Sequence, residues 1–165
     1  MFGWLRDAGV KEHELDWFHG NAGADLIDVQ GVNYYPQWSY AAALPSGDLL
    51  PVNGGVLLLE SHIRRFWRKY RMPIMITETS VRGGNWEKSA WLSSSVSCVR
   101  RLRSEAISVV GYTWFPVLDM IDWEYRNTEA TANDYRMELG LWTLERTERS
   151  AAQTYRELIR NGIDG

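Results

Sequence analysis

Three short apolar runs, separated by stretches with helical spacing, constrain the fold of this chain most strongly. The runs are LIDVQGVNYY (26–35), PIMITE (73–78) and ISVVGYTWF (107–115). All are rich in β-branched or aromatic residues, and only the middle run contains a proline, at its first position, where a strand tolerates one. Continuous apolar runs, rather than alternating ones, are typical of parallel strands that are covered on both faces.

The segments after the runs predict helices. Apolar residues recur there at intervals close to three and four, which is the spacing of one helix face. The predicted helices span residues 54–71, 87–106 and 150–161, the last closing before Gly162 as its C-cap. The last opens with Ser150 three residues before Gln153, the pattern of a capping box. Strand and helix therefore alternate, which predicts an α/β domain of parallel βαβ units over residues 1–165.

Composition excludes several classes of function. The 165 residues suit one domain, and the net charge of −3 gives no indication of a nucleic acid or an anionic membrane as partner. The single cysteine, Cys98, permits no internal disulfide and fits a reducing compartment. The start lacks the pattern of a signal peptide, and no stretch is apolar enough to span a bilayer, so we expect a cytoplasmic protein. We expect no cofactor and no metal, because neither metal-ligand spacing nor a glycine-rich phosphate loop occurs.

Polar and aromatic residues gather where the predicted strands end. They are Asn33, Tyr34 and Tyr35, then Glu78, then Trp114 and Phe115, followed in the next loop by Asp119, Asp122, Trp123 and Glu124. The carboxyl ends of parallel strands share one edge of a sheet, and two long loops, 36–53 and 116–140, leave from it. A glutamate at a strand end is often only a surface residue. Beside phenols, tryptophans and an amide it also suits a site for a sugar.

The sequence resembles a known family in four ordered stretches. DVQGVNYYP, PIMITETS, GYTWFPVLDMIDW and ELGLWTLERTERSAAQTYREL resemble the closing segments of glycoside hydrolase family 1 and its clan relatives. Those enzymes are (β/α)8 barrels that hydrolyse β-glycosides with retention. The resemblance runs from about residue 4 to residue 161. It implies a partial TIM-barrel domain that holds the last three strands and helices of the barrel.

The resemblance also implies roles for the catalytic residues. The family's nucleophile falls on Glu78, whose carboxylate would attack the anomeric carbon of the sugar. The tyrosine that donates a hydrogen bond to the nucleophile falls on Tyr35 or Tyr34. A phenol that donates to a carboxylate stabilises the anion and fixes its rotamer.

Further positions of the resemblance imply contacts with a carbohydrate substrate. Asp122 matches an acid that binds sugar hydroxyls, and Trp123 matches a tryptophan that contacts the sugar. Phe115 matches a tryptophan that forms a platform under the sugar, and Trp114, one residue earlier, either takes that role or points into the core. Asn33 is either a substrate contact or a cap at the strand end.

Two departures from the family bear on the function. The family has Glu-Asn-Gly where this chain has Glu78, Thr79 and Ser80, and it has Glu at the position of Asp122. The family's acid/base motif, Asn-Glu-Pro, does not occur in the sequence, and neither Glu60 nor Glu124 is a convincing substitute. Three hypotheses follow. The chain is part of a retaining β-glycosidase whose N-terminal barrel portion is a partner, or a non-catalytic module for carbohydrate binding or assembly, or an inactive truncated fragment.

Overall fold

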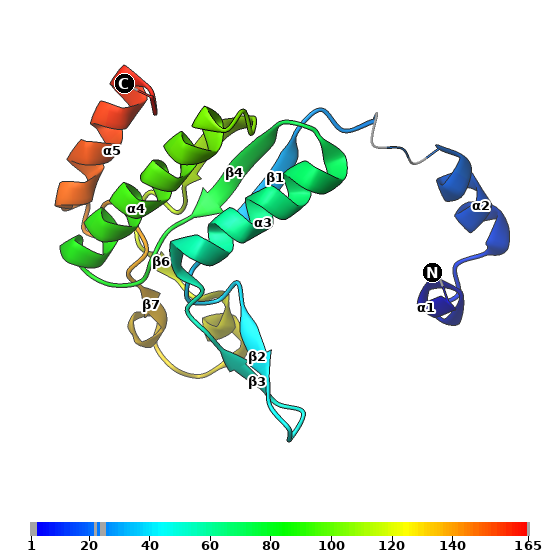
Figure 1. Cartoon of the computed structure of the whole chain (residues 1–165). Coiled ribbons are helices and arrows are strands. Elements are labelled where there is room, and N and C mark those ends of the chain that lie inside the picture. The colour runs from blue at the N-terminus through cyan, green and yellow to red at the C-terminus, as the bar shows by residue number, and fades with distance from the viewer. Residues whose placement is uncertain (1–2, 22, 24–25, 165) are drawn as a thin grey trace.

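A parallel sheet forms the centre of the protein. The computed structural model describes residues 3–21, 23 and 26–164 (Figure 1). Strands β1 (Gln30–Tyr34), β4 (Ile74–Thr79) and β5 (Val109–Trp114) pair in parallel in the order β1-β4-β5. The α/β class and the parallel pairing of the apolar runs are therefore confirmed.

Three helices cover one face of this sheet (Figure 1). They are α3 (Gly55–Tyr70), α4 (Asn85–Ser104) and α5 (Ser150–Asn161). The buried side chains of these helices and of the strands form one apolar core; its members include Val32, Ile74, Ile76, Val109, Leu59, Ile63, Leu92, Val99, Ala151 and Ala152. This packing buries alternate apolar residues of each strand, whereas the coverage of both faces that the continuous runs predicted is not found among the described residues.

Two local predictions were wrong. The first strand begins at Gln30 rather than at residue 26, and the preceding residues Leu26 and Ile27 are exposed. The capping box at Ser150 does not form, because the N-cap of α5 is Arg149 and has no side-chain cap. Ser150 is instead the first helical residue, and its backbone N–H donates to Asn85 Oδ1 at 3.2 Å.

The opposite face of the sheet is open and carries both polar and apolar side chains. Thr77 Oγ1 donates to Asn33 Oδ1 at 2.7 Å across neighbouring strands. A Cβ atom on Gly31 would lie 3.3 Å from the Thr77 side chain, and one on Gly111 would lie 2.9 Å from Met75 Cγ. Glycines at these positions let the side chains of the central strand lean across this face.

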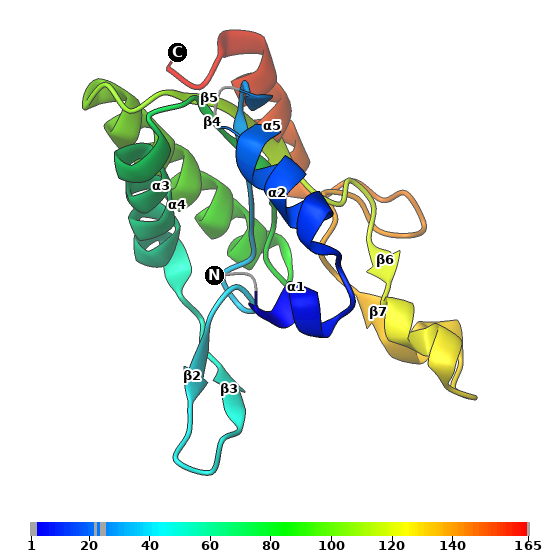
Figure 2. The ribbon, with the colours of Figure 1, turned by 90° about the vertical axis from the view of Figure 1, so that its right-hand side faces the viewer.

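The two long loops contain structure of their own and project from the same end of the sheet (Figures 1 and 2). The first holds a hairpin of β2 (Ala41–Ala43) and β3 (Leu49–Pro51). The second pairs β6 (Met120–Ile121) with β7 (Arg136–Met137), and two 3-10 turns, Trp123–Asn127 and Ala132–Tyr135, lie between them.

Two further helices precede the sheet. Helices α1 (Gly3–Asp7) and α2 (Glu12–Asn21) lie apart from the helix-covered sheet (Figure 1), and Trp4 and Trp17 on them are exposed. Of the helices that the structure describes, none has the length and apolar character needed to cross a membrane.

Candidate active site

The sheet brings Glu78 and Tyr35 into contact at its carboxyl edge. Tyr35 Oη donates a hydrogen bond of 2.8 Å to Glu78 Oε2. The contact forms because β1 and β4 are neighbours and Asn33 lies opposite Glu78, after a register shift between Val32 and Asn33. Burial, and then the bond to Glu78, raise the pKa of the Tyr35 phenol, so the hydroxyl keeps its proton and stays a donor.

The neighbouring tyrosine points to the other side of the sheet. Tyr34 is 1% exposed and stacks on Trp91 with ring centroids 6.0 Å apart. Its Oη donates to the backbone oxygen of Gly55 at 2.7 Å, which fixes the start of α3. Successive residues of a strand face opposite sides, so only one of the two tyrosines can reach Glu78. That residue is Tyr35, and Tyr34 belongs to the core.

A pocket of about 380 Å³ opens beside Glu78. Strand β4 and the loops after β1 and β5 line it: Tyr35, Trp38, Glu78, Phe115, Met120, Asp122, Trp123, Glu124, Met137 and Leu139. Five of the residues singled out in the sequence for these roles thus meet in one place. Trp123 is 70% exposed, so its ring is available to a ligand. The combination of carboxylates with flat aromatic walls suits a sugar, whose C–H faces pack on rings and whose hydroxyls donate to carboxylates.

Three of the residues predicted to contact the substrate lie outside the pocket lining: Tyr34, described above, Trp114 and Asn33. Trp114 is buried, and its Nε1 donates to the backbone oxygen of Leu139 at 3.0 Å, so it supports the pocket from behind. Phe115, one residue later, lines the pocket. Asn33 accepts from Thr77 on the open face of the sheet.

Sequence reasoning missed other residues of the lining, above all Trp38. The ring of Trp38 lies 5.7 Å from that of Tyr35, and the Arg82 guanidinium stacks over it at 5.3 Å. The sequence could have indicated Trp38 by its position, three residues after Tyr35 in a loop that follows a strand. Glu124 also lines the pocket, and its backbone N–H donates to Asp122 Oδ1 at 3.1 Å, so one oxygen of Asp122 caps the 3-10 turn.

A buried ion pair holds the loop that carries most of the pocket. Asp119 is buried, and its two carboxylate oxygens accept from both terminal nitrogens of Arg149, each at 2.8 Å. Asp119 Oδ1 also accepts from the backbone N–H of Gly140 at 2.9 Å. These bonds join the two ends of the loop to each other and to the start of α5.

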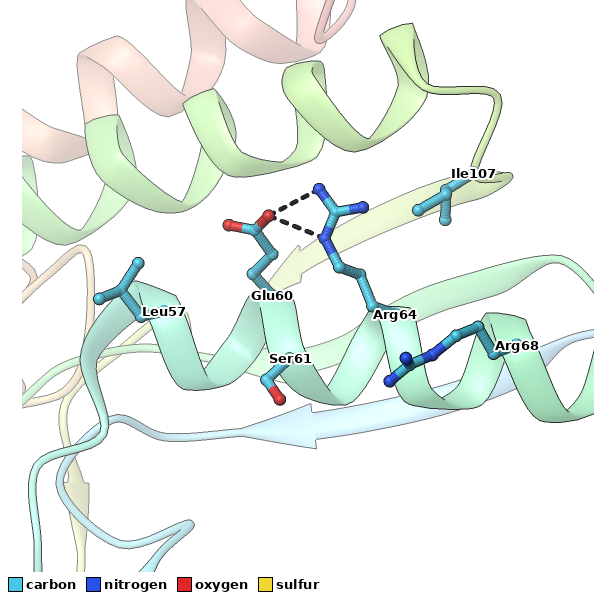
Figure 3. Close-up of a pocket in the computed structure, with 6 residues that line it drawn as sticks. All are labelled: Leu57, Glu60, Ser61, Arg64, Arg68 and Ile107. Atoms are coloured by element: carbon cyan, nitrogen blue, oxygen red, sulfur yellow. Dashed lines mark hydrogen bonds and ion pairs between the residues drawn. The ribbon is translucent and has the colours of Figure 1, made fainter.

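A larger hollow, of about 520 Å³, runs along α3 (Figure 3). Two of its charged groups are already paired: Glu60 with Arg64 at 2.7 Å and with Arg101, and Arg64 also with Glu105. The bonds from Arg101 and Arg64 lower the pKa of Glu60. This surface is a solvated ion-pair network between helices, and the pocket at the strand ends remains the candidate site.

Other reactive groups do not form a second centre. Cys98 is buried in α4, and burial raises the pKa of its thiol to about 11, so it stays protonated at neutral pH. Within residues 3–21, 23 and 26–164, no three histidine, cysteine or acidic side chains converge as a metal site.

The fold is similar to that of known β-glycosidases. No protein-family model and no curated protein matches the chain. Among solved structures, the β-glucosidase from Thermotoga maritima in complex with glucoimidazole matches with a TM-score of 0.64 and 14% identity, over 84% of this chain and 35% of that chain. The β-glycosidase from the hyperthermophile Thermosphaera aggregans matches with a TM-score of 0.60 and 20% identity, over 84% and 33%. The GH1 β-glucosidase from Exiguobacterium antarcticum B7 matches with a TM-score of 0.59 and 15% identity, over 81% and 34%.

The chain thus spans about a third of the length of the β-glycosidases it matches. At sequence identities of 14–20%, the similarity to these structures shows the fold alone. The resemblance to glycoside hydrolase family 1 that the sequence motifs indicate is confirmed at that level: the α/β structure matches part of the β-glucosidase barrel.

Proposed function

We propose that this chain carries the nucleophile of a retaining β-glycoside hydrolase and corresponds to the last three βα units of its (β/α)8 barrel. The observation that supports this best is the 2.8 Å hydrogen bond from Tyr35 Oη to Glu78 Oε2 in a pocket with aromatic walls. A carboxylate at the carboxyl end of a parallel strand, with one oxygen held by a phenol, is positioned as a nucleophile.

In the proposed reaction, Glu78 attacks the anomeric carbon of the sugar. A bond forms between a carboxylate oxygen and that carbon, and the bond to the leaving oxygen breaks, with the leaving group taking the electron pair. Water then attacks the same carbon, its proton passes to a second carboxyl group, and the bond to the Glu78 oxygen breaks, which releases Glu78 as a carboxylate. Tyr35 holds Oε2 and so fixes the orientation of the carboxylate. Phe115 and Trp123 form walls for the sugar ring, and Asp122 accepts from a hydroxyl.

The mechanism needs a second carboxyl group about 5–5.5 Å from the nucleophile to protonate the leaving oxygen. The family's Asn-Glu-Pro motif does not occur in the sequence. In the described sheet, β1 and β5 are edge strands, and each has a free hydrogen-bonding edge to which further barrel strands could add. We infer that the N-terminal barrel portion binds there and supplies the acid/base.

Hydrolysis of dinitrophenyl β-glucoside by the full chain tests the proposal. Dinitrophenolate is a weak base and leaves without a proton, so its release in the first step needs the nucleophile alone, whereas hydrolysis of the glycosyl-enzyme still needs a base to activate water. We expect the 165-residue chain to release dinitrophenolate above the background rate and Glu78→Gln to return the rate to background. Glu124→Gln, which removes a different carboxylate of the same pocket, serves as the matched control. A Glu78→Gln variant with the original rate would overturn the proposal.

Sugar binding without hydrolysis is the second candidate. It is favoured by the exposure of two tryptophans of the pocket, 70% for Trp123 and 44% for Trp38. We expect cellobiose to change the tryptophan fluorescence in a saturable manner and Trp123→Ala to reduce that change. A signal that does not depend on cellobiose concentration would exclude this candidate.

A further inference from the structure

A fully buried lysine lies beneath the pocket. Lys88, in the first turn of α4, is 0% exposed, which is rare for a lysine. Its Nζ donates to three backbone oxygens: to Glu138 at 2.6 Å, to Val81 at 3.4 Å, and to Gly83. An ammonium group has three N–H donors, so every one of them has an acceptor.

The three acceptors belong to two different loops. Val81 and Gly83 lie in the loop after β4, three and five residues beyond Glu78. Glu138 lies further along the loop after β5, the loop that carries Asp122 and Trp123. The backbone N–H of Gly83 also donates to the backbone oxygen of Glu138 at 3.3 Å, so the two loops meet directly above the lysine.

Both tied segments reach the pocket. Arg82, between the first two acceptors, stacks over the Trp38 ring at 5.3 Å. Met137 and Leu139, on either side of the third acceptor, line the pocket. A displacement of either segment would therefore change the shape of the pocket.

The charges around Lys88 come from several elements. Burial lowers its pKa most, and Arg149 at the start of α5 lowers it further. Asp119 and Glu138 of the loop after β5 raise it, as does Glu87 on α4, and the result is a pKa of about 8. Because the folded state holds this proton less tightly than the unfolded state, the contribution of Lys88 to stability increases as the pH rises from about 8 towards 10.5.

We propose that Lys88 is a positioning residue that holds the loop behind the nucleophile against the loop that carries the sugar contacts, and so sets the width of the pocket. The role of the pocket as a sugar site rests on the proposed function. The tie between the loops does not, and it can be measured separately.

Amide hydrogen exchange at pH 7 tests the tie. In Lys88→Met the backbone oxygens of Val81, Gly83 and Glu138 lose a charged donor. We expect exchange in residues 80–84 and 137–141 to become about tenfold faster or more, the effect of losing a hydrogen bond to a charged group. Lys88→Arg should restore the slow exchange, and Lys69→Met, which removes an exposed lysine, should leave it unchanged. Unchanged exchange in Lys88→Met would overturn the proposal. Should that variant fail to fold, Lys88→Gln replaces it, with the same expected direction.

Cellobiose titration, followed by tryptophan fluorescence, tests positioning against a purely structural role. We expect Lys88→Met to weaken binding about tenfold, by the same lost bonds, and Lys88→Arg to bind like the original protein. A folded Lys88→Met with unchanged affinity would overturn positioning. If the original protein binds no cellobiose, the proposed function fails, and the exchange experiment still decides whether the tie exists. Thermal melts at pH 7 and pH 9.5 add a check. The difference in melting temperature between the original chain and Lys88→Met should shift in favour of the original chain at pH 9.5.

Discussion

The loop after β1 and the loop after β5 leave the same edge of the sheet but are held in different ways. The first, residues 35–54, extends as a hairpin whose strands are mostly exposed. It is fixed at its base, where Ser39 Oγ accepts from the N–H of Tyr35 at 2.7 Å and the N–H of Gly54 donates to Pro36 at 2.8 Å. The second, residues 115–149, is fixed by buried charges: Asp119 with Arg149, and Lys88.

The difference follows what each loop contributes to the pocket. The loop after β1 supplies only residues near its base, Tyr35 and Trp38. The loop after β5 supplies residues along much of its length, from Phe115 to Leu139. Side chains that are far apart in an irregular segment need anchors to meet at one site. Buried ion pairs supply such anchors because they tolerate little change in geometry.

Loss of the buried ion pair between Asp119 and Arg149 should have the largest effect on stability. Asp119→Ala leaves the Arg149 guanidinium buried without its partner, and we expect a loss of about 3–5 kcal/mol in the free energy of unfolding. Urea denaturation of the two proteins measures it. Asp48→Ala in the hairpin, where the carboxylate accepts from the exposed Ser46, should stay within about 0.5 kcal/mol. Equal losses for both variants would abolish the contrast between the loops.

A pair of glycines sharpens the comparison. A Cβ on Gly140, in the loop after β5, would lie 2.3 Å from the backbone of Leu118 and Asp119, so the anchored loop must shift, and we expect Gly140→Ala to cost about 3 kcal/mol. Gly47, at the hairpin tip, has open space around it but a φ of +90°, so Gly47→Ala should cost only about 1–2 kcal/mol. Urea midpoints of both variants test the order, and the reverse order would contradict it.

The two adjacent tyrosines should separate stability from function. Tyr34→Phe removes the bond to Gly55 in the core and should cost about 1 kcal/mol without affecting reaction at Glu78. Tyr35→Phe removes the bond to Glu78 and should slow release of dinitrophenolate while stability changes little. Melting temperature and rate are measured on both variants. A slower reaction in Tyr34→Phe, with Tyr35→Phe unaffected, would reverse the assignment of the two residues.

The smallest effect is expected at the surface of the anchored loop. The bidentate contact with Arg136 lowers the pKa of Glu145 from 4.5 to about 2. Its contribution is fully present above pH 4.5 and is lost as the pH falls towards 2. We expect the small difference in melting temperature between the original chain and Glu145→Gln to shrink between pH 6 and pH 3. A constant difference would show that the pair does not act through its charge.

The sequence predicts the strands, their parallel direction and the edge at which Glu78 lies, because these follow from hydrophobic periodicity and from the alternation of strand and helix. It leaves the choice between Tyr34 and Tyr35 open, since the register shift between β1 and β4 after Val32 sets which residues of β1 lie beside Glu78. The anchors are harder to foresee. Asp119 and Arg149 are 30 residues apart in the chain, and Lys88 binds backbone oxygens, which no side-chain motif marks.

The residues around the site show the same limit. Trp38 and Leu139 reach the pocket only because the loops fold back to the strand ends. Trp114 was predicted either to contact the sugar or to point into the core, and the bond from its Nε1 to Leu139 places it in the core. Patterns within one segment predict that segment well, whereas contacts between loops depend on the assembled structure.

Covalent trapping tests the central claim most directly. Dinitrophenyl 2-deoxy-2-fluoro-β-glucoside reacts with a retaining nucleophile to form a long-lived glycosyl-enzyme, and its leaving group needs no acid catalyst. The account predicts that the intact chain gains the mass of one fluoroglucosyl group, that the modified peptide carries it on Glu78, and that Glu78→Gln gains none. Labelling of another residue, such as Glu124, or equal labelling of Glu78→Gln, would contradict the assignment of Glu78 as the nucleophile.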